Sequence, residues 1–202
     1  MQDFFDYHTH AYDRENAFIS IKAEDLRNGV TLPQGSKFFL EYHPWNLKHE
    51  YHGVETEFIE LAKSDMVYGI GEVGLDKLKQ ENASIEVQLA YFEELVALSA
   101  DLRKPLMLHV VKSWSEARKV LEKYKISKIY FHGFLGKIEL LRELLNFGMT
   151  VSLNPKMLER SELYSFLQQN PKFLEQLKLE TDDTSLDVKS LYLSFYERLK
   201  NV

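Results

Sequence analysis

Histidines with nearby carboxylates are the residues of this chain best suited to chemistry. His8 and His10 follow an apolar run near the start, one residue apart, and Asp6 stands two residues before His8. Successive side chains of a strand point to opposite faces, so on a strand all three would share one face. Two imidazoles and a carboxylate that converge on one point could hold a metal ion. Histidines at this spacing also arise by chance on exposed strands, so the pattern alone leaves both interpretations open.

The same kind of residue recurs along the chain, each time after a short apolar run. Five of the seven histidines stand at the ends of predicted strands, and acidic residues end two further strands. In a barrel of parallel strands the carboxyl ends meet at one face, where active sites form. If each histidine were separately a core or rim residue, five coincidences would be needed, so we favour a shared metal site. The residues are His8, His10, His43, His109 and His132, with Glu72 and Asp182.

The donor atoms of this set predict the kind of ion. Four of these imidazoles (all but that of His43) with the two carboxylates suit Zn²⁺ or Mn²⁺ better than Mg²⁺, which prefers oxygen ligands and keeps its waters. Six ligands are too many for one open tetrahedral site, but they fit two metals about 3.5–4 Å apart with one bridging carboxylate. We therefore expect two divalent ions (Zn²⁺, Mn²⁺ or Mg²⁺), which would lower the pKa of a bound water and stabilise charge on a phosphoryl oxygen.

Short apolar strands that alternate with helical patterns must position these side chains. Helical spacing is found around Phe58 and over residues 87–98, and an S-x-x-E capping box predicts a helix start at Ser113. Gly148 suits the left-handed residue after a helix, and Asp187 is the expected N-cap of the last helix. The expected strands cover residues 4–7, 18–22, 37–42, 67–72, 105–109, 128–132, 149–153 and 177–181.

The order of these elements predicts the fold class. Strands alternating with helices imply parallel pairing, and about eight of them in one domain imply an α/β fold, a distorted TIM (β/α)8-type barrel. Only seven residues separate His10 from Phe18, too few for a usual crossover helix, and the link over residues 23–36 has a poor helical pattern. We therefore expect the first one or two helices to be shortened or missing. A second strand that runs antiparallel, as in a hairpin, stays open.

The composition limits the class of protein. The 202 residues are 45% hydrophobic and 28% charged, which fits a single domain over residues 1–202. The start lacks the basic and long apolar regions of a signal peptide, and no apolar stretch approaches the roughly 18 residues of a membrane span. With no cysteine, disulfides and thiolate metal sites are excluded. We expect a cytoplasmic protein with no membrane partner.

The charge distribution limits how the chain could bind nucleic acid. Its net charge is −6, and the densest basic run, over residues 119–128, is best explained as a solvated helix face. Proteins that bind duplex DNA through many phosphates usually carry a basic stripe. Any contact with nucleic acid should therefore be local, at one end or one scissile group. The sequence indicates no obligate protein partner.

Five blocks of the sequence resemble the signature blocks of the TatD family, in family order and over nearly the whole chain. This family belongs to the amidohydrolase-like metal-dependent hydrolases. The resemblance implies a distorted TIM barrel, a binuclear divalent metal site and, as in characterised members, deoxyribonuclease activity that is often 3′→5′ exonucleolytic. The blocks are Asp6-x-His8-x-His10, Gly71-Glu72-Val73-Gly74-Leu75-Asp76, Pro105-Leu106-Met107-Leu108-His109, His132-Gly133-Phe134 and Glu180-Thr181-Asp182.

The resemblance also implies roles for single residues. Asp182 would act as general base toward the water that attacks phosphorus, and Glu72 would bridge the metals where related amidohydrolases often use a carboxylated lysine. Glu180, one layer deeper on the face of Asp182, would either support a metal ligand or simply fill the barrel. One metal would be held by His8, His10, Glu72 and Asp182, and the second by Glu72, His109 and His132.

The chain departs from the family pattern at positions that would meet the substrate. Members commonly have His-Ser-Arg after the fifth strand, whereas this chain has His109-Val110-Val111-Lys112, so the arginine expected to meet a phosphate is absent. Whether Lys112 replaces it stays open, and a lysine lacks the bidentate fork that grips a phosphate. Gly133 stands where cysteine is common, and Asp183-Thr184 where Ala-Pro is common. With the short length, these variants resemble a short bacterial subgroup of the family. They bear on the substrate and leave the metal ligands intact.

Three residues are candidates for contact with the substrate: His43, Lys112 and Trp45. Trp45 would stack on a nucleobase or pack at the rim, and His43 would touch the substrate or cap its loop.

We expect hydrolysis of phosphodiester bonds at DNA ends or in short nucleotides. The alternatives are a hydrolase of another small phosphoester, ester or amide, and a catalytically silent metal-binding relative. A silent protein could lose any of the six ligands, so the complete set favours an enzyme.

Overall fold

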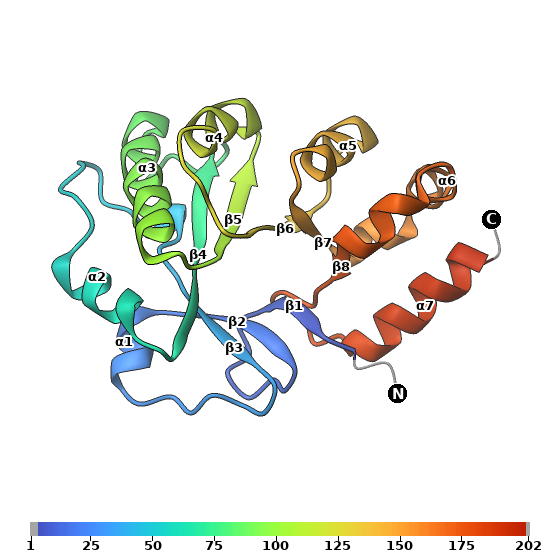
Figure 1. The fold of residues 1–202 in the computed structure, drawn as a ribbon, viewed down its shortest axis with the longest axis horizontal. Coiled ribbons are helices and arrows are strands. Elements are labelled where there is room, and N and C mark those ends of the chain that lie inside the picture. The colour runs from blue at the N-terminus through green and yellow to red at the C-terminus, as the bar shows by residue number, and fades with distance from the viewer. Residues whose placement is uncertain (1–3, 201–202) are drawn as a thin grey trace. The chain divides into compact units, whose positions relative to one another are not determined.

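The structure, a computed structural model that describes residues 4–200, contains all eight expected strands (Figure 1). Within this part of the chain the sheet order is the chain order, β1 to β8. The longest strand, β4, runs past its predicted end at residue 72 to Asp76. The strands are β1 (Asp6–Thr9), β2 (Ala17–Ile21), β3 (Lys37–Leu40), β4 (Val67–Asp76), β5 (Leu106–Val111), β6 (Ile129–Phe134), β7 (Thr150–Leu153) and β8 (Leu177–Leu179).

Every described strand except β1 is followed by a helix, and local signals set the helix ends. The Gly148 backbone is left-handed (φ 92°) and its N–H donates to Leu145, which ends the helix before it. Asp187 accepts a hydrogen bond from the Ser190 N–H at 2.9 Å, which caps the last helix. Both caps confirm the sequence prediction. The helices are α1 (Ala23–Arg27), α2 (Thr56–Lys63), α3 (Ile85–Leu102), α4 (Trp114–Leu121), α5 (Ile138–Asn146), α6 (Ser161–Gln169) and α7 (Val188–Lys200), with short 3-10 helices η1 (Pro44–Asn46), η2 (Pro155–Glu159) and η3 (Pro171–Gln176).

Helix α4 starts where predicted, but its capping box does not form. The Ser113 hydroxyl donates to the Val111 carbonyl at 2.8 Å instead of accepting from the helix. The Glu116 carboxylate, the expected second half of the box, accepts from the Lys77 ammonium at 2.5 Å. A full positive charge attracts a carboxylate more strongly than a backbone N–H does, so the tertiary contact replaces the local one.

The described chain divides into two compact units. The first contains residues 4–19, 33–36 and 130–200, so it holds β1, the start of β2, β7, β8 and nearly all of β6, with α5, α6 and α7. The second contains residues 20–32 and 37–129, with β3, β4 and β5 and helices α1 to α4. The expectation of a single domain over residues 1–202 stays a prediction.

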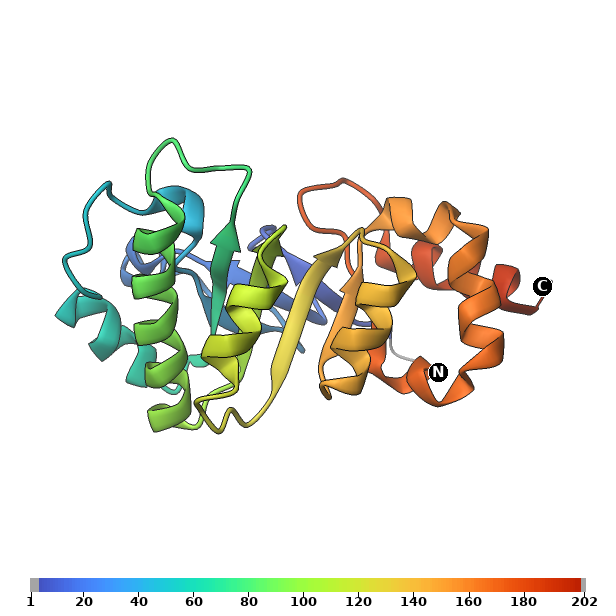
Figure 2. The same cartoon turned by 90° about the horizontal axis from the view of Figure 1, so that it is seen from above.

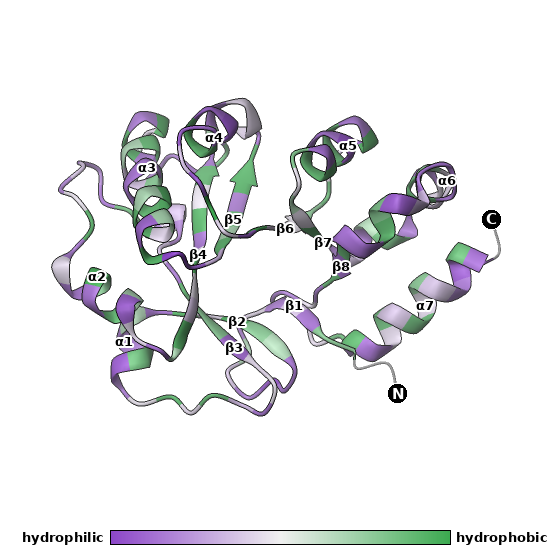
Figure 3. Ribbon diagram, viewed as in Figure 1, coloured by the Kyte–Doolittle hydropathy of each residue, from purple (hydrophilic) through white to green (hydrophobic). Residues whose placement is uncertain are grey.

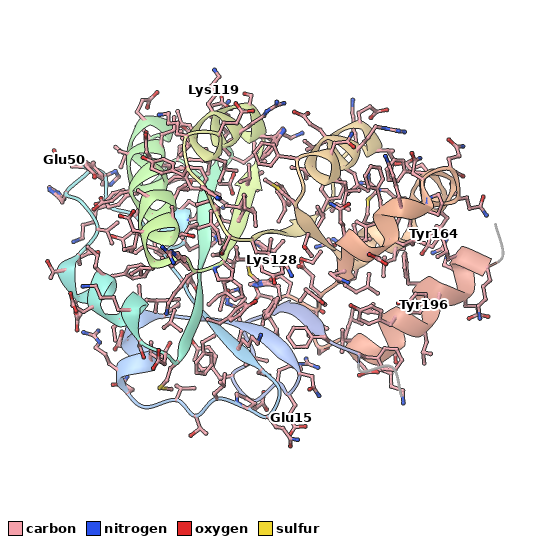
Figure 4. The ribbon with its side chains drawn as sticks, viewed as in Figure 1. Glu15, Glu50, Lys119, Lys128, Tyr164 and Tyr196 are labelled. Carbon is pink, nitrogen blue, oxygen red and sulfur yellow. The ribbon has the colours of Figure 1, made fainter. Side chains whose placement is uncertain are left out.

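In the first unit, parallel pairing runs from β6 through β7 to β8. A further bridge joins Thr9 at the end of β1 to Asp182, just past β8, so the carboxyl ends of these two strands meet. Helices α6 and α7 pack on each other, and Tyr164 of α6 is buried there with its hydroxyl donating to the Leu158 carbonyl at 2.8 Å (Figure 4).

The link between β1 and β2 confirms the missing helix and rules out a hairpin. The two strands pair in parallel, with Asp6 opposite Ala17 and Thr9 opposite Ile19. The seven residues between His10 and Phe18 contain a turn, closed by the Arg14 N–H on the Ala11 carbonyl, and enter β2 at Ala17 without forming a helix. A four-residue strand is about 13 Å long, and seven extended residues reach about 24 Å. The chain can therefore return along so short a strand without a helix.

In the second unit, β3, β4 and β5 pair in parallel, and α3 and α4 lie side by side along them (Figure 2). Figure 3 shows apolar stretches along β4 and β5 and alternating polar and apolar residues along α3. Gly74 lets β4 approach β5 closely, because a Cβ there would lie 1.9 Å from the His109 carbonyl oxygen. This close approach brings the ends of the two strands together.

Two expectations about the surface can be compared with the described residues. Over residues 4–200, no helix is both long and apolar enough to cross a membrane. Lys119 and Lys128, at the two ends of the densest basic run, are both exposed, and Lys119 extends away from α4 (Figure 4). Only the first of them lies on the helix, because α4 ends at Leu121.

Candidate metal centre

In the first unit, His8, His10 and Asp182 gather where the carboxyl ends of β1 and β8 meet. One Asp182 carboxylate oxygen lies 3.5 Å from Nε2 of His8 and 3.9 Å from Nε2 of His10. His8 is fully buried, whereas 28% of the Asp182 side chain is exposed. The two histidines lie on one face of the strand, as their spacing predicts, with ring centroids 4.9 Å apart. This arrangement offers two imidazoles and one accessible carboxylate.

His132, from β6, joins the same cluster. Its ring centroid lies 4.3 Å from that of His8. Among the described residues, His8, His132 and Asp182 form a group whose ligand atoms lie close enough to share one metal ion. Nδ1 of His132 lies 3.7 Å from Oε1 of the buried Glu180. The other oxygen of Glu180 accepts a hydrogen bond from the Ser152 hydroxyl of β7, so Glu180 contacts a candidate ligand and not only the interior.

The backbone holds Asp182 in place from two sides. Its N–H donates to the His8 carbonyl at 2.9 Å, and its carbonyl accepts from the Thr9 hydroxyl at 3.3 Å. Asp182 has a left-handed backbone (φ 52°), which is costly for a residue other than glycine and persists where surrounding contacts impose it. The contacts with β1 therefore fix the direction in which the Asp182 side chain points.

Asp6 joins β1 to β8 and lies outside the candidate metal groups among the described residues. Its fully buried carboxylate accepts from the Thr181 N–H at 3.0 Å and from the Thr181 hydroxyl at 2.6 Å. Burial raises the pKa of the Asp6 carboxyl, although the hydrogen bonds from Thr181 act in the opposite direction. The sequence suggested a carboxylate beside the two histidines, and the structure gives it a structural partner instead.

In the second unit, His43, Glu72 and His109 form a second cluster at the ends of β3, β4 and β5. Oε2 of the buried Glu72 lies 3.6 Å from Nε2 of His43 and 3.5 Å from Nδ1 of His109. The two imidazole rings have centroids 4.4 Å apart. Among the described residues these three also form a group that could hold one metal ion. His43 caps its loop as well, because its Nδ1 accepts from the Trp45 N–H at 3.2 Å.

Asp76, to which the sequence assigned no role, contacts two residues of this cluster. Its Oδ2 accepts from the Trp45 indole N–H at 2.8 Å and lies 3.6 Å from Nε2 of His109. Its Oδ1 accepts from the Leu78 N–H at 2.8 Å. Burial alone would raise the pKa of Asp76, but the contacts with His109, Trp45 and Leu78 hold it below its ordinary value. His109 thus has one ring nitrogen toward Glu72 and the other toward an ionised carboxylate.

The donor set fits divalent metal ions. Each unit supplies imidazole nitrogens together with a carboxylate, which suits Zn²⁺ or Mn²⁺. An outer carboxylate on the second nitrogen of a metal-ligating histidine is a common support for such ligands. Asp76 stands in that relation to His109, and Glu180 lies in a similar place beside His132.

Comparison with known proteins establishes the family. The family model described as TatD related DNase matches residues 18–189. The chain belongs to the TatD family. The match begins after His8 and His10, so the assignment of these two residues rests on their spacing and on the geometry of the first cluster.

Two curated relatives show how far the likeness extends. A deoxyribonuclease Tat-D of Schizosaccharomyces pombe is 32% identical over 129 residues, which are 62% of this TatD chain and 41% of the relative. An uncharacterized metal-dependent hydrolase of Methanocaldococcus jannaschii is 30% identical over 165 residues, 80% of this chain and 60% of the relative. The chain thus spans about half the length of these relatives.

A solved structure shows the fold. The crystal structure of a TatD homologue from Escherichia coli K12 matches with a TM-score of 0.72 at 19% identity, covering 90% of this TatD chain and 78% of the other. Together with eight described strands in sequence order and helices between them, this likeness confirms the predicted α/β class and TIM (β/α)8-type barrel.

Most of the predicted site residues lie close to other site residues of their own unit. His8, His10, His132 and Asp182 come together in the first unit, as do Glu72, His109, His43 and Trp45 in the second. Lys112 is exposed directly after β5 with a left-handed backbone (φ 55°). Asp76 could have been found from the sequence, because alternation along a strand that includes Glu72 places residues 74 and 76 on the same face.

Proposed function

We propose that this TatD-family protein is a divalent-metal-dependent hydrolase of phosphodiester bonds, acting on DNA as a 3′→5′ exonuclease-like deoxyribonuclease. The observation that carries the proposal is that each unit gathers metal-ligating side chains at the carboxyl ends of its parallel strands. Family membership supports it, as does the printed name of the S. pombe relative. The substrate expected is a DNA end or a short nucleotide.

The proposed ligands are those expected from the sequence. His8, His10, Glu72 and Asp182 would hold one divalent ion, and Glu72, His109 and His132 the other. Bound ions of this kind supply a water of lowered pKa and positive charge for a phosphoryl oxygen. Glu72 is 2% exposed, and a buried carboxylate is costly unless a positive charge accompanies it. Divalent ions held by Glu72 would supply that positive charge.

The protein's own side chains would handle the proton and the substrate. Asp182 would take the proton of the attacking water at its carboxylate, which is the part-exposed acid of the first cluster. Asp76 and Glu180 would keep His109 and His132 oriented. His43, Lys112 and Trp45 would contact the substrate, with Lys112 as a single positive charge for a phosphate.

The net charge of −6 does not favour binding along many phosphates of the DNA. We therefore expect the protein to contact the DNA only near the end of the strand. We propose the cytoplasm as the compartment and no obligate protein partner.

The test is cleavage of a single strand labelled at its 5′ end, with added Mn²⁺, beside a simple aryl phosphodiester. We expect stepwise loss of 3′ nucleotides that stops when a chelator is added. Glu72→Gln should lack the activity, and Glu94→Gln, an acid of the same unit outside the cluster, should keep it. If the metals bind but neither substrate is cleaved, the nuclease proposal fails. Hydrolysis of another small phosphoester, ester or amide, or a silent metal-binding role, would then replace it.

A further inference from the structure

Trp45 is exposed and yet firmly held beside the second cluster. Its side chain is 45% exposed, whereas Trp114, the other tryptophan of the chain, is 9% exposed in the core. The Trp45 indole N–H donates to Asp76 at 2.8 Å, its backbone N–H donates to His43, and its carbonyl accepts from Asn82 at 2.7 Å. Hydrogen bonds, rather than full burial, therefore hold this ring in place.

The two histidine rings beside the indole are not stacked on it. The imidazole rings of His43 and His109 meet it at 83° and 79°, with centroids 4.9 and 5.6 Å away. Because both meet it nearly at right angles, neither lies flat against the indole. An exposed aromatic face whose position is already fixed can stack on a planar ring with little further loss of conformational freedom.

A positive charge accompanies the ring. The Lys79 ammonium lies over it at 5.6 Å from the centroid and, like the ring, is exposed. A nucleotide carries a flat base together with an anionic phosphate, so a ring beside an ammonium complements both parts. The same ring lies against two histidines of the candidate metal cluster, so a nucleotide bound here would have its phosphate near the reacting centre.

We propose that Trp45 is a stacking platform for the unpaired base of a terminal nucleotide, with Lys79 as partner of its phosphate. This rests on the proposed function and adds that the base of the terminal nucleotide is recognised directly. In a duplex each base is already stacked and paired, so reaching Trp45 would require the end to fray.

Binding can be measured through Trp45 itself. Trp114→Phe leaves Trp45 as the sole tryptophan, and a chelator prevents hydrolysis. We expect a trinucleotide to quench its fluorescence saturably. The same trinucleotide with an abasic terminal residue, equal in charge, should bind about 5- to 150-fold more weakly. Equal affinity of the two ligands, or unchanged emission with both, would overturn the proposal.

Cleavage gives a second and independent test in the otherwise unaltered chain. We expect the ratio of kcat/KM for the base-bearing over the abasic substrate to fall toward one in Trp45→Leu and to stay largely intact in Trp45→Phe. Because Trp45 also donates to Asp76, its loss can slow both substrates, and the ratio isolates the contribution of the base. Tyr51→Leu is the matched control, because Tyr51 is equally exposed at 45% but hydrogen-bonded to Glu94.

The outcomes separate the two proposals. An unchanged ratio in Trp45→Leu, with good cleavage, would refute the platform and leave the nuclease proposal standing. No cleavage of any phosphodiester would refute the nuclease proposal, and the fluorescence titration would still decide whether Trp45 binds a base.

Discussion

Asp182 combines a fixed backbone with a side chain that the solvent can reach. It lies 3.5 Å from His8, and 28% of its side chain is exposed. Asp182→Asn keeps the shape and removes the proton acceptor, so we expect kcat to fall by about 10²–10⁴-fold with modest loss of metal. Steady-state kinetics and metal analysis of the same sample measure the two effects. Asp187→Asn is the control, because asparagine caps a helix equally well. An unchanged kcat would remove Asp182 as general base.

Asp76 supports His109 and Trp45 with a single carboxylate oxygen. Asp76→Asn keeps the volume but loses the charge that faces His109. We expect the affinity for Mn²⁺ to fall by about 10–100-fold, as is usual when the outer partner of a ligating histidine is lost. Calorimetric titration of Mn²⁺ into apo protein measures it. Glu94→Gln, which alters the partner of Tyr51 and the Val54 N–H, should bind Mn²⁺ as the wild type does. Wild-type affinity in Asp76→Asn would contradict this role.

At the residue scale, the sequence revealed the candidate ligands because histidines at strand ends stand out against apolar runs. It missed Asp76 for a physical reason. The predicted strand ended at residue 72, whereas β4 uses Gly74 to approach β5 and continues to Asp76. The partners of Asp6 were equally hidden, because Thr181 lies 175 residues away in the sequence.

Between elements, the Asp6–Thr181 pair holds β1 against the end of β8. Asp6→Ala would leave two buried donors of Thr181 without their acceptor, so we expect a loss of about 1–3 kcal/mol in the free energy of unfolding. Urea unfolding measures it. Thr181→Val keeps the N–H bond and should lose less, and the double variant should lose less than the sum of the two. Strictly additive losses would show that the two residues do not act through each other.

The ion pair between Lys77, just after β4, and Glu116 of α4 predicts a pH dependence. Contact with Lys77 and Ser115 lowers the pKa of Glu116 from 4.5 to about 2. A carboxyl with a lowered pKa in the folded state stabilises the fold above its unfolded pKa, and this is lost as the pH falls toward 2. Both side chains are partly exposed, so the pair is worth at most about 1 kcal/mol.

Urea unfolding at pH 6 and pH 3 tests this pair. We expect the wild type to lose more stability than Glu116→Gln over that interval, because the variant has no carboxyl to protonate. Equal losses in the two proteins would mean that the ion pair contributes nothing to the pH dependence.

The elements themselves followed from the sequence to a large extent. All eight strands in the described chain were predicted, because short apolar runs between helical patterns identify buried parallel strands. The missing helix after β1 followed from the seven-residue gap. The parallel direction of β2 did not, because it depends on how far an extended link can reach past a short strand. The cap of α4 failed because Lys77, distant in sequence, competes for Glu116.

For the whole molecule, the question is whether the ligands of the two units serve one binuclear centre. Each unit by itself offers imidazoles with a carboxylate. The family match covers residues 18–189 and so includes Glu72, His109, His132 and Asp182, whereas His8 and His10 lie before it. The first-strand histidines are therefore the part of the proposed centre that depends most on this chain's own sequence and geometry.

The most direct test of that centre is the number of divalent ions bound per chain. Apo protein would be loaded with Mn²⁺ or Zn²⁺, dialysed and measured by mass spectrometry of the metal, beside a double variant with His8 and His10 replaced by Asn. We predict about two ions in the wild type and about one in the variant. A wild-type chain that binds none, or a variant that keeps both, would contradict the account.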